Sequence, residues 1–226
     1  YYTEADTETE VKILHVDQSR EHPAYSAHRG GVHVSTLAKA FKKIKFYTRE
    51  NVGIGEIQLP PEEFETEACA LVLRPELVAR LGLQKGGEAS CLQGVGELLQ
   101  GLVPLFVRVD PGDVKVLAEA LHPHFQAPAV ILYDRIPSGV GLAERIYDVH
   151  RDILDAALQL VLRCSCRSGC PSCVGPQASL GVRSKTVATT ILREMLAPMP
   201  AAAVRANPGR ANLGERELEA DGRAGS

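Results

Sequence analysis

"CSCRSGCPSC", residues 164–173, places four of the six cysteines of this 226-residue chain within ten positions. The spacing C-x-C-x3-C-x2-C brings four thiolates close enough to surround one Zn²⁺ ion tetrahedrally, at Zn–S distances of about 2.3 Å. The predicted ligands are Cys164, Cys166, Cys170 and Cys173. Because the protein would then fill all four coordination positions, the pattern predicts a closed structural site with one zinc per chain, not a hydrolytic site.

The residues around these cysteines suit such a site. Pro171 fixes the turn between the last two ligands, where backbone N–H groups can bond a thiolate, and Gly169 and Gly175 let the chain bend around the ion. Four thiolates on a divalent ion carry net negative charge, and they would follow the negative end of a helix. Arg163 and Arg167 flank the ligands, and we expect them to offset that charge.

Other chemistries also use clustered cysteines. Four thiolates can hold an iron–sulfur cluster, which stays the alternative cofactor. Two disulfides would suit an exported protein, but the polar and acidic start "YYTEADTETE" (1–10) is unlike a secretory signal. A catalytic Cys-x-x-Cys redox pair would leave two neighbouring thiols without a role. Zinc is therefore the favoured interpretation.

Outside the cluster, the chain divides into a strand-rich and a helix-rich part. Residues 1–74 carry β-branched and aromatic residues between Gly and Pro turn signals, which is typical of strands. Residues 75–196 carry apolar residues mostly at intervals of three and four, which is typical of helices. The predicted strands lie at 11–16, 30–48, 66–74 and 128–134. The expected fold is α+β, one domain over residues 1–196 in which the β-rich half packs on a helical, zinc-binding half.

Two predicted helices lie on either side of the cysteine cluster. The apolar spacing predicts one helix at about 140–163, which runs straight into the cluster, and a last helix at about 183–196. A zinc knuckle would pin the end of the first helix to the second, so metal binding would contribute folding free energy directly. Residues 197–226 have almost no large apolar side chain and are expected to form a disordered tail.

Composition argues against some classes of protein. The formal net charge of −3 shows no basic excess, so any contact with nucleic acid must be local. No apolar run approaches the roughly 20 residues that span a bilayer, so we expect no membrane contact and a cytoplasmic location. Residue 1 is not methionine, and the only methionines are Met195 and Met199, so we expect the chain to be a piece of a longer protein.

A run of basic residues alternates with aromatic side chains in the β-rich half. Its cations are Lys39, Lys42, Lys43, Lys45 and Arg49, and its aromatics are Phe41, Phe46 and Tyr47. Cations for phosphates beside rings for base stacking would suit single-stranded DNA. The solvated face of a strand ribbon explains the same run equally well, and both interpretations stay open.

The loop "PSGVG" (137–141) lies between a predicted strand and a predicted helix. Backbone amides at such a position can bind a phosphate, which makes Gly139 and Gly141 candidate contacts to a nucleic-acid backbone. The alternative is a tight turn that needs glycine geometry. Asp134 and Arg135, which precede the loop, could position it.

No stretch of the chain matches an ATP-binding motif. The segment "GVRSKT" (181–186) has Ser184 where a P-loop needs glycine before its lysine. No Ser–His–Asp arrangement or carboxylate pair is evident either. We therefore expect this chain not to be catalytic alone.

With these residues in place, the chain resembles the C-terminal zinc-binding domain of MrfA-like (mitomycin repair factor type) superfamily 2 DEAD/DEAH-box helicases, long described as a domain of unknown function. The matching landmarks, in order, are "YYT" (1–3), "LPPEEFETEA" (59–68), "PLFVRVDPGD" (104–113), "YDRIPSGVGLAER" (133–145) and the cysteine cluster. The family loop usually reads Pro-Gly-Gly-x-Gly, whereas Ser138 replaces its first glycine in this chain.

The resemblance implies a part of an ATP-dependent 3′-to-5′ DNA helicase that acts in DNA repair, with its motor lobes upstream in the same chain. The expected role is to shape or guide single-stranded DNA. The alternative is a protein-interaction module that docks the helicase to a repair or phage-defence partner without contacting DNA. Salt dependence separates the two, because phosphate contacts weaken steeply as salt rises.

Overall fold

The computed structural model describes residues 1–81, 89–174 and 184–198. Strands and helices both occur, so the fold is α+β as predicted. Its strands are β1 (Tyr2–Ile13), β2 (Gln18–Glu21), β3 (Tyr25–Ile44), β4 (Asn51–Glu56), β5 (Glu62–Leu73), β6 (Val114–His122) and β7 (Ala127–Asp134). Its helices are α1 (Pro75–Leu81), α2 (Ala89–Val107), α3 (Leu142–Arg163) and α4 (Ser184–Leu196).

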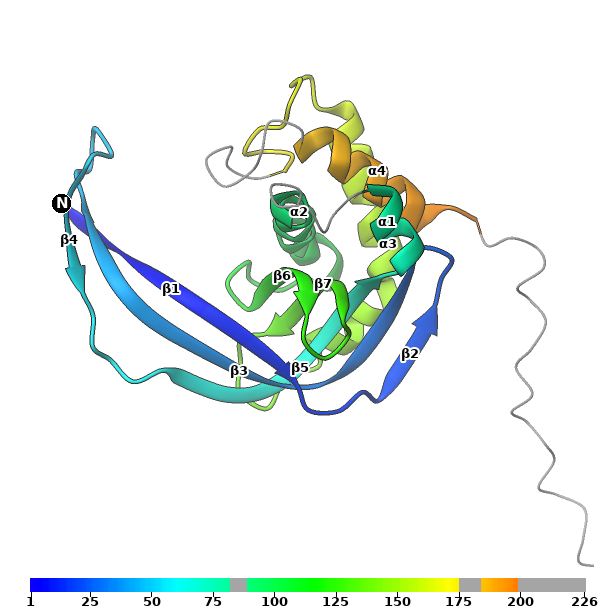
Figure 1. Cartoon of the computed structure of the whole chain (residues 1–226), viewed down its shortest axis with the longest axis horizontal. Coiled ribbons are helices and arrows are strands. Elements are labelled where there is room, and N and C mark those ends of the chain that lie inside the picture. Colours follow the sequence, from blue (N-terminus) through cyan, green and yellow to red (C-terminus); the bar gives the residue numbers. More distant parts are fainter. Residues whose placement is uncertain (82–88, 175–183, 199–226) are drawn as a thin grey trace, which may run out of the picture.

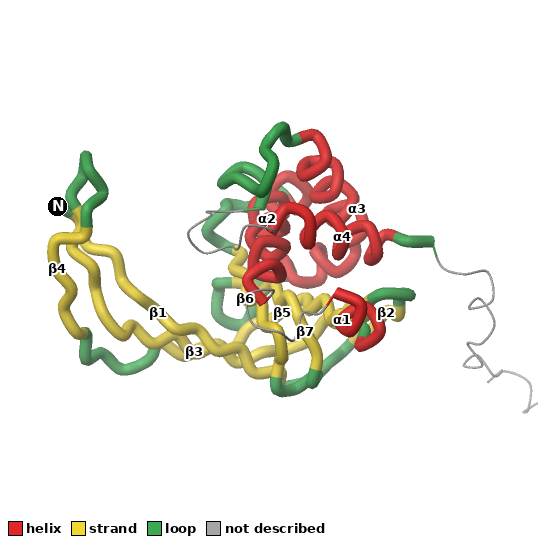
Figure 2. Tube along the Cα trace, turned by 45° about the horizontal axis from the view of Figure 1, so that its top comes forward, coloured by secondary structure: helices red, strands yellow, loops and turns green. Residues whose placement is uncertain are grey.

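The described strands form one antiparallel sheet in the order β1-β3-β5-β7-β6. The long strand β3 organises this sheet, because β1, β2, β4 and β5 all pair with it. The sheet is strongly curved, and α2, α3 and α4 lie on its concave side in Figure 1. Figure 2 shows the same two layers, with the helices gathered over one end of the sheet.

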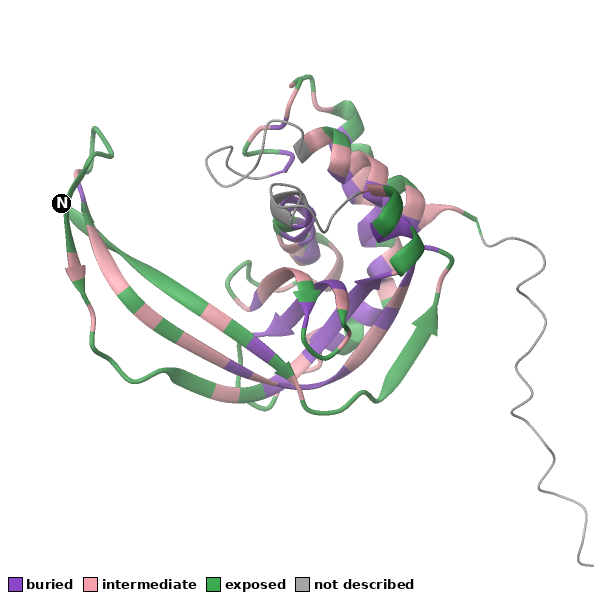
Figure 3. Ribbon diagram, in the orientation of Figure 1, coloured by how far each residue is buried: buried purple, intermediate pink, exposed green. Residues whose placement is uncertain are grey.

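The core between sheet and helices follows from the two-residue period of the strands. In β5, Cys69, Leu71 and Leu73 face the helices, and they join the apolar faces of α2, α3 and α4 in one buried cluster. The alternate residues of β5, which include Ala70, belong to a second cluster on the other face of the sheet, together with Ile131 of β7. The buried positions in Figure 3 accordingly concentrate where helices and strands overlap.

The second face of the sheet is shielded from solvent because the sheet curls until its two edge strands come into contact. Strand β6, at one end of the strand order, contacts β1, at the other end. The buried His122 ring places Nε2 3.1 Å from the carbonyl oxygen of Val11, and so bridges the two edge strands. His122 therefore has a structural role in the sheet.

One part of the sheet extends beyond the helices as a three-stranded arm, visible at the left of Figures 1 and 2. We define the arm as the first half of β1, residues 37–44 of β3, the loop 45–50 and β4. Its register pairs Glu4 with Lys42 across β1 and β3, and Phe41 with Gly55 across β3 and β4. Most residues of the arm are exposed or half-buried.

The structure confirms the predicted helices at 140–163 and 183–196 as α3 and α4. Three strands were not among those predicted, namely β2, β4 and β6, and β1 begins at Tyr2, well before the predicted strand at 11–16. Strands β6 and β7 pair with β5, so the sheet crosses the expected division at residue 74. Of the predicted disordered tail at 197–226, residues 199–226 lie outside the described residues. In the described ranges, no helix combines the length and hydropathy that a membrane span requires.

Candidate metal centre

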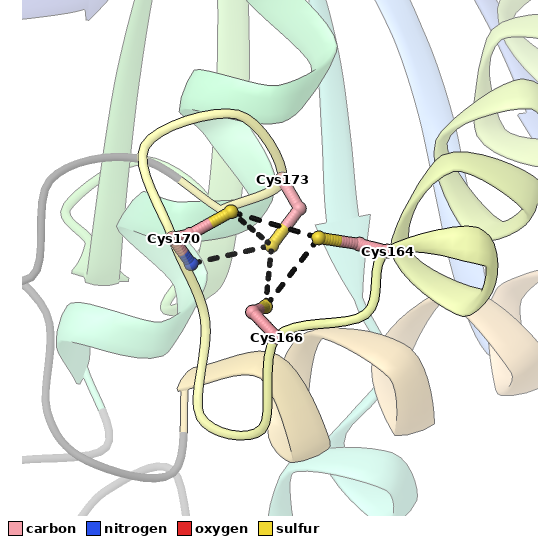
Figure 4. A group of neighbouring side chains, drawn as sticks. All are labelled: Cys164, Cys166, Cys170 and Cys173. Carbon is pink, nitrogen blue, oxygen red and sulfur yellow. Dashed lines mark hydrogen bonds between the residues drawn. The ribbon is translucent and has the colours of Figure 1, made fainter.

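The four predicted ligands converge just after the last residue of α3. Figure 4 shows their sulfur atoms pointing toward a common centre. The Sγ atom of Cys166 lies 3.5 Å from those of Cys164 and Cys173, and the Sγ atom of Cys170 lies 3.6 Å from the same two. All four sulfurs lie within 4.8 Å of one another. The four thiols thus form one compact donor set.

This geometry fits a single divalent ion. Sulfurs at about 2.3 Å from a tetrahedral zinc are separated by about 3.8 Å, which is close to the four separations of 3.5 to 3.6 Å given above. Cys173 is buried and the other three cysteines are half-buried against the helical core. The donors are soft, and the four of them complete a tetrahedron, so the arrangement suits a structural zinc site with no open position for substrate.

The local backbone supports the donor set. Cys170 donates its N–H to the sulfur of Cys173 at 3.3 Å, as expected for a knuckle around Pro171. Gly169 has φ +121°, a conformation that a residue with a side chain rarely adopts, so the predicted bend at this glycine is confirmed. Gly175, the other predicted bend, lies outside the described residues.

The thiols experience unequal environments. A hydrogen bond from the Cys166 backbone, followed by bonds among the thiols, lowers the pKa of Cys164 to about 7. Burial raises the pKa of Cys173 to about 12. A metal ion must therefore displace at least one strongly held proton when all four sulfurs bind as thiolates.

A lysine from α4 completes the site, and the sequence analysis missed it. The Nζ atom of Lys185 donates to the carbonyl oxygens of Cys164 at 2.6 Å and of Cys166 at 2.7 Å. Its backbone N–H donates to the carbonyl oxygen of Ser168 at 3.2 Å. The side chains expected in this role, Arg163 and Arg167, are exposed. The only signal for Lys185 was a cation in the first turn of the helix that follows the cluster.

The loop 137–141 lies at the opposite end of α3, about 33 Å away along a 22-residue helix. The buried carboxylate of Asp134 accepts N–H groups from Val140 at 2.9 Å, Leu142 at 3.2 Å and Ala143 at 2.9 Å. Burial raises the pKa of Asp134 above its ordinary value, although these three donors act to lower it. Asp134 positions the loop as expected, and its carboxylate occupies the place at the helix N-terminus where an anion would bind.

Two more amides of this loop are also committed. Ser138 donates its N–H to Glu65 at 2.8 Å, and Gly139 donates to Ile136 at 3.0 Å. Ser138, Gly139 and Gly141 all have positive φ, between +68° and +82°. The geometry therefore accounts for the loop as a tight turn, and a phosphate contact by Gly139 and Gly141 stays a prediction.

The predicted basic run lies on the arm, remote from both ends of α3 in Figure 1. Lys39 pairs with Glu8 at 2.5 Å, Lys42 with Asp6 at 3.7 Å, and Lys45 with Glu50 at 2.8 Å. Lys43 and Arg49 are exposed and form no ion pair within the described residues. The structure therefore separates the predicted metal, loop and arm residues into three places. DNA contact by these cations stays a prediction.

Comparison with known proteins identifies the region around the cysteines. The family model of the MrfA Zn-binding domain matches residues 95–174, which include all four cysteines and the whole of α3. The uncharacterized ATP-dependent helicase YprA of Bacillus subtilis is 37% identical over 197 residues, which are 86% of this chain and 26% of that protein. The ATP-dependent helicase hrq1 of Schizosaccharomyces pombe is 23% identical over 162 residues, 66% of this chain and 15% of that protein.

A solved structure shares the fold as well as the sequence. The crystal structure of the DUF1998 helicase MrfA bound to DNA matches with a TM-score of 0.66 and 37% identity, covering 86% of this chain and 26% of that one. The chain thus spans about a quarter of the length of YprA and of MrfA, and less of hrq1.

Proposed function

This chain carries the zinc-binding domain of MrfA-like helicases, and from that premise we propose that it is the non-motor accessory part of an ATP-dependent 3′-to-5′ DNA helicase. The motor lobes lie upstream in the same polypeptide. The parent enzyme works in the cytoplasm on DNA repair, and this domain shapes or guides the single strand that the motor handles.

The observation that carries the proposal is the preformed cage of four sulfurs inside the family-matched segment. A closed cage supplies rigidity and no reaction centre, which is what an accessory domain requires. Further support comes from the relatives, two of which are named ATP-dependent helicases, and from the crystal structure of MrfA bound to DNA.

The proposed cofactor is one zinc ion per chain. In a four-iron cluster each cysteine binds a separate iron, so the sulfurs stand at the corners of a larger body than a single ion. The four sulfurs of this site lie within 4.8 Å of one another, which favours a mononuclear centre over an iron–sulfur cluster. Zinc also yields a colourless protein, whereas an iron–sulfur cluster absorbs visible light.

A second candidate function is docking of the helicase to a repair or phage-defence protein. It is favoured by the ion pairs on the arm, because Lys39 and Lys42 are neutralised by Glu8 and Asp6 and offer phosphates less attraction. The exposed apolar side chains of Phe46 and Ile54 would suit a protein surface. Binding through such a surface would change little between low and high salt.

The test compares the wild-type parent helicase with its Cys170→Ser variant. We expect the variant to lose zinc and to separate a forked duplex at least about tenfold more slowly, while DNA-stimulated ATP hydrolysis by the motor persists. Cys69→Ser is the matched control, because Cys69 is a buried thiol of the sheet and no part of the metal site. A zinc-free Cys170→Ser enzyme that unwinds at the wild-type rate would contradict the proposed role.

A further inference from the structure

The loop that joins β3 to β4 forms the end of the arm and is held by its own backbone. Lys45 donates its N–H to the carbonyl oxygen of Glu50 at 3.0 Å, and Arg49 donates its N–H to that of Lys45 at 3.1 Å. Arg49 has φ +54°, so the four residues between these bonds make a defined turn. Two side chains are therefore presented outward from a fixed base, namely Phe46 and Tyr47.

The aromatic residues of the arm divide into two kinds. The ring of Phe41 lies over Gly55 of β4, where a Cβ atom would come within 2.5 Å of it, so this ring fills space within the sheet. Tyr47 is 99% exposed and Phe46 is 64% exposed. Packing does not account for two such rings at one place.

These exposed rings surround a cavity of about 250 Å³, which we call the tip pocket. Its lining residues are Tyr1, Lys45, Phe46, Tyr47 and Thr48. The ring of Tyr2 lies 5.6 Å from that of Phe46, centroid to centroid, and braces one wall. The pocket thus combines aromatic faces with the ion pair of Lys45 and Glu50 and with a hydroxyl, which suits a flat, polar-edged ring.

Charge is distributed unevenly along the arm. The stretch of β1 from residue 4 to 10 carries four carboxylates and no cation, and it neutralises the lysines opposite. Residues 43–55, around the tip pocket, carry three cations and a single carboxylate, Glu50. Lys43 and Arg49 have no ion-pair partner among the described residues, so they are available to an anionic ligand. The positive end of the arm therefore coincides with its exposed rings.

We propose that the tip pocket binds an unpaired base of a single-stranded nucleic acid. The base stacks on Phe46 and Tyr47, and Lys43 and Arg49 contact the neighbouring phosphates. Stacking on aromatic faces is tolerant of base identity, which suits a domain that guides a strand of any sequence. The inference rests on the proposed DNA-guiding function. It places the contact with the strand at the tip pocket, and not at Lys39 and Lys42, which are paired with carboxylates of β1.

The first test uses Tyr47→Trp in the 226-residue chain, which has no tryptophan of its own. Oligo(dT) is titrated into this variant and the indole fluorescence is recorded. Stacking of a base on the indole is expected to quench the emission, whereas a blunt duplex, whose bases are already stacked, is expected to leave it unchanged. Equal quenching by duplex and single strand would overturn the proposal. Oligo(rU) in a parallel titration shows whether the site distinguishes DNA from RNA.

The second test measures binding of labelled oligo(dT) by anisotropy. Phe46→Ala and Tyr47→Ala are each expected to weaken binding about fivefold or more. Lys43→Ala and Arg49→Ala are each expected to lower the slope of log affinity against log salt by about 0.7. The matched controls are Leu121→Ala, an exposed apolar residue on β6, and Lys12→Ala, an exposed lysine at the base of the arm. Both controls should stay within about twofold of wild type.

The outcomes separate this proposal from the function on which it rests. If the chain binds oligo(dT) but all four tip variants behave as wild type, the tip pocket is wrong and DNA guidance by another surface stands. If the wild-type chain does not bind oligo(dT), and the parent helicase binds single strands equally well with or without this domain, both proposals fail. Salt-insensitive capture of a protein at the tip would also overturn the base-binding site.

Discussion

Helix α3 is held at both ends by charge, but the two ends use different chemistry. At its start, the carboxylate of Asp134 accepts the N–H groups of Leu142 and Ala143, which the helix cannot satisfy itself, and that of Val140 in the preceding loop. At its end, four thiols gather after Arg163, and the cation of Lys185 bonds the carbonyls of two ligand residues. The first end is complete within the polypeptide, whereas the second depends on an ion. Stability should therefore be independent of metal at one end and governed by metal at the other.

The largest expected effect is removal of the metal from the second end. Cys170→Ser, or treatment with a strong chelator, should abolish zinc binding and lower the melting temperature, because binding free energies of structural zinc sites reach about 10–16 kcal/mol in small peptides. Metal content by mass spectrometry and a thermal melt measure both effects. Cys69→Ser should retain its metal. If the Cys170→Ser chain bound zinc as tightly as wild type, the four-cysteine site would not be the metal site at this end of α3.

The next effect concerns the first end of the helix. Asp134→Ala should lower the free energy of unfolding by about 2–4 kcal/mol, because it removes the acceptor for a helix N-terminus and leaves buried donors unpaired. Gly141, at the N-cap position, has no side chain to replace it. Urea denaturation measures the loss, and Asp148→Ala, at an exposed carboxylate of the same helix, is the control. If Asp134→Ala kept the wild-type free energy of unfolding but lost zinc, the two ends of α3 would not be independent.

Lys185→Met tests whether a residue of α4 that is not a metal ligand contributes to zinc binding at the second end of α3. The variant removes the cation from the Cys164 and Cys166 carbonyls, and we expect zinc affinity to fall about tenfold, as for other groups that hold metal ligands in place. Competition against a chromophoric chelator measures it. Lys115→Met, on β6, should have wild-type affinity. If both variants match wild type, the cation of Lys185 does not contribute to zinc binding.

The middle of α3 contacts the segment before β3 through two neutral histidines, His150 and His22. His150 donates from Nδ1 to the Tyr147 carbonyl at 2.6 Å, and its Nε2 lies 3.3 Å from Nε2 of His22. Because Arg151 donates to Nδ1 of His22 at 3.3 Å, the proton between the rings belongs to His22, and both rings are neutral. A further proton on either ring would meet an N–H group that already points at that nitrogen. It would also add positive charge near the cations of Arg20 and Arg151, so protonation of the pair is unfavourable.

This pair predicts a loss of stability in mild acid. Burial, followed by the charge of His150, lowers the pKa of His22 to about 4, and burial lowers the pKa of His150. A histidine whose pKa is lower in the folded state contributes stability above its unfolded pKa of about 6.5, and that contribution is lost as pH falls toward the folded value. Urea midpoints should therefore decrease between pH 7 and pH 5. His150→Gln should reduce this dependence, and an equal decrease in the variant would assign it to other groups such as His28.

The smallest expected effect returns to the first end of α3. Ser138 has φ +68°, a strained conformation for a residue with a Cβ atom. Ser138→Gly should therefore raise the free energy of unfolding by about 1 kcal/mol. Ser35→Gly, within strand β3, should change stability in the opposite direction. Thermal melts of the two variants measure the difference, and equal signs would contradict the strain at Ser138.

The sequence predicted the parts of this molecule whose information is local. The metal ligands lie within ten residues, so their spacing alone limits which atoms can meet. Helices α3 and α4 repeat their apolar residues every three or four positions, because a helix turns every 3.6 residues. The α+β class followed from the same periodicities. Asp134 was expected to position its loop because it precedes that loop directly.

Contacts between distant segments could not be derived in this way. The sequence of the basic run does not show whether its lysines face phosphates or carboxylates. The pairing of Lys39 with Glu8 and of Lys42 with Asp6 follows only from the register of β1 on β3. Strand β6 and the polar half of β1 lack a strong apolar alternation, so their place in the sheet comes from their partners. Lys185 likewise meets the cysteine carbonyls only because α4 packs against α3.

The sequence by itself therefore determined which atoms can bind the metal, which helices enclose the site and to which class the fold belongs. The tertiary structure alone decided which cation supports the ligands, which lysines are neutralised and which aromatic rings stay exposed. The physical reason is that side-chain spacing along a helix or a tight loop is set by backbone geometry. Charge pairing and burial depend instead on free energies summed over segments that the chain brings together only when it folds.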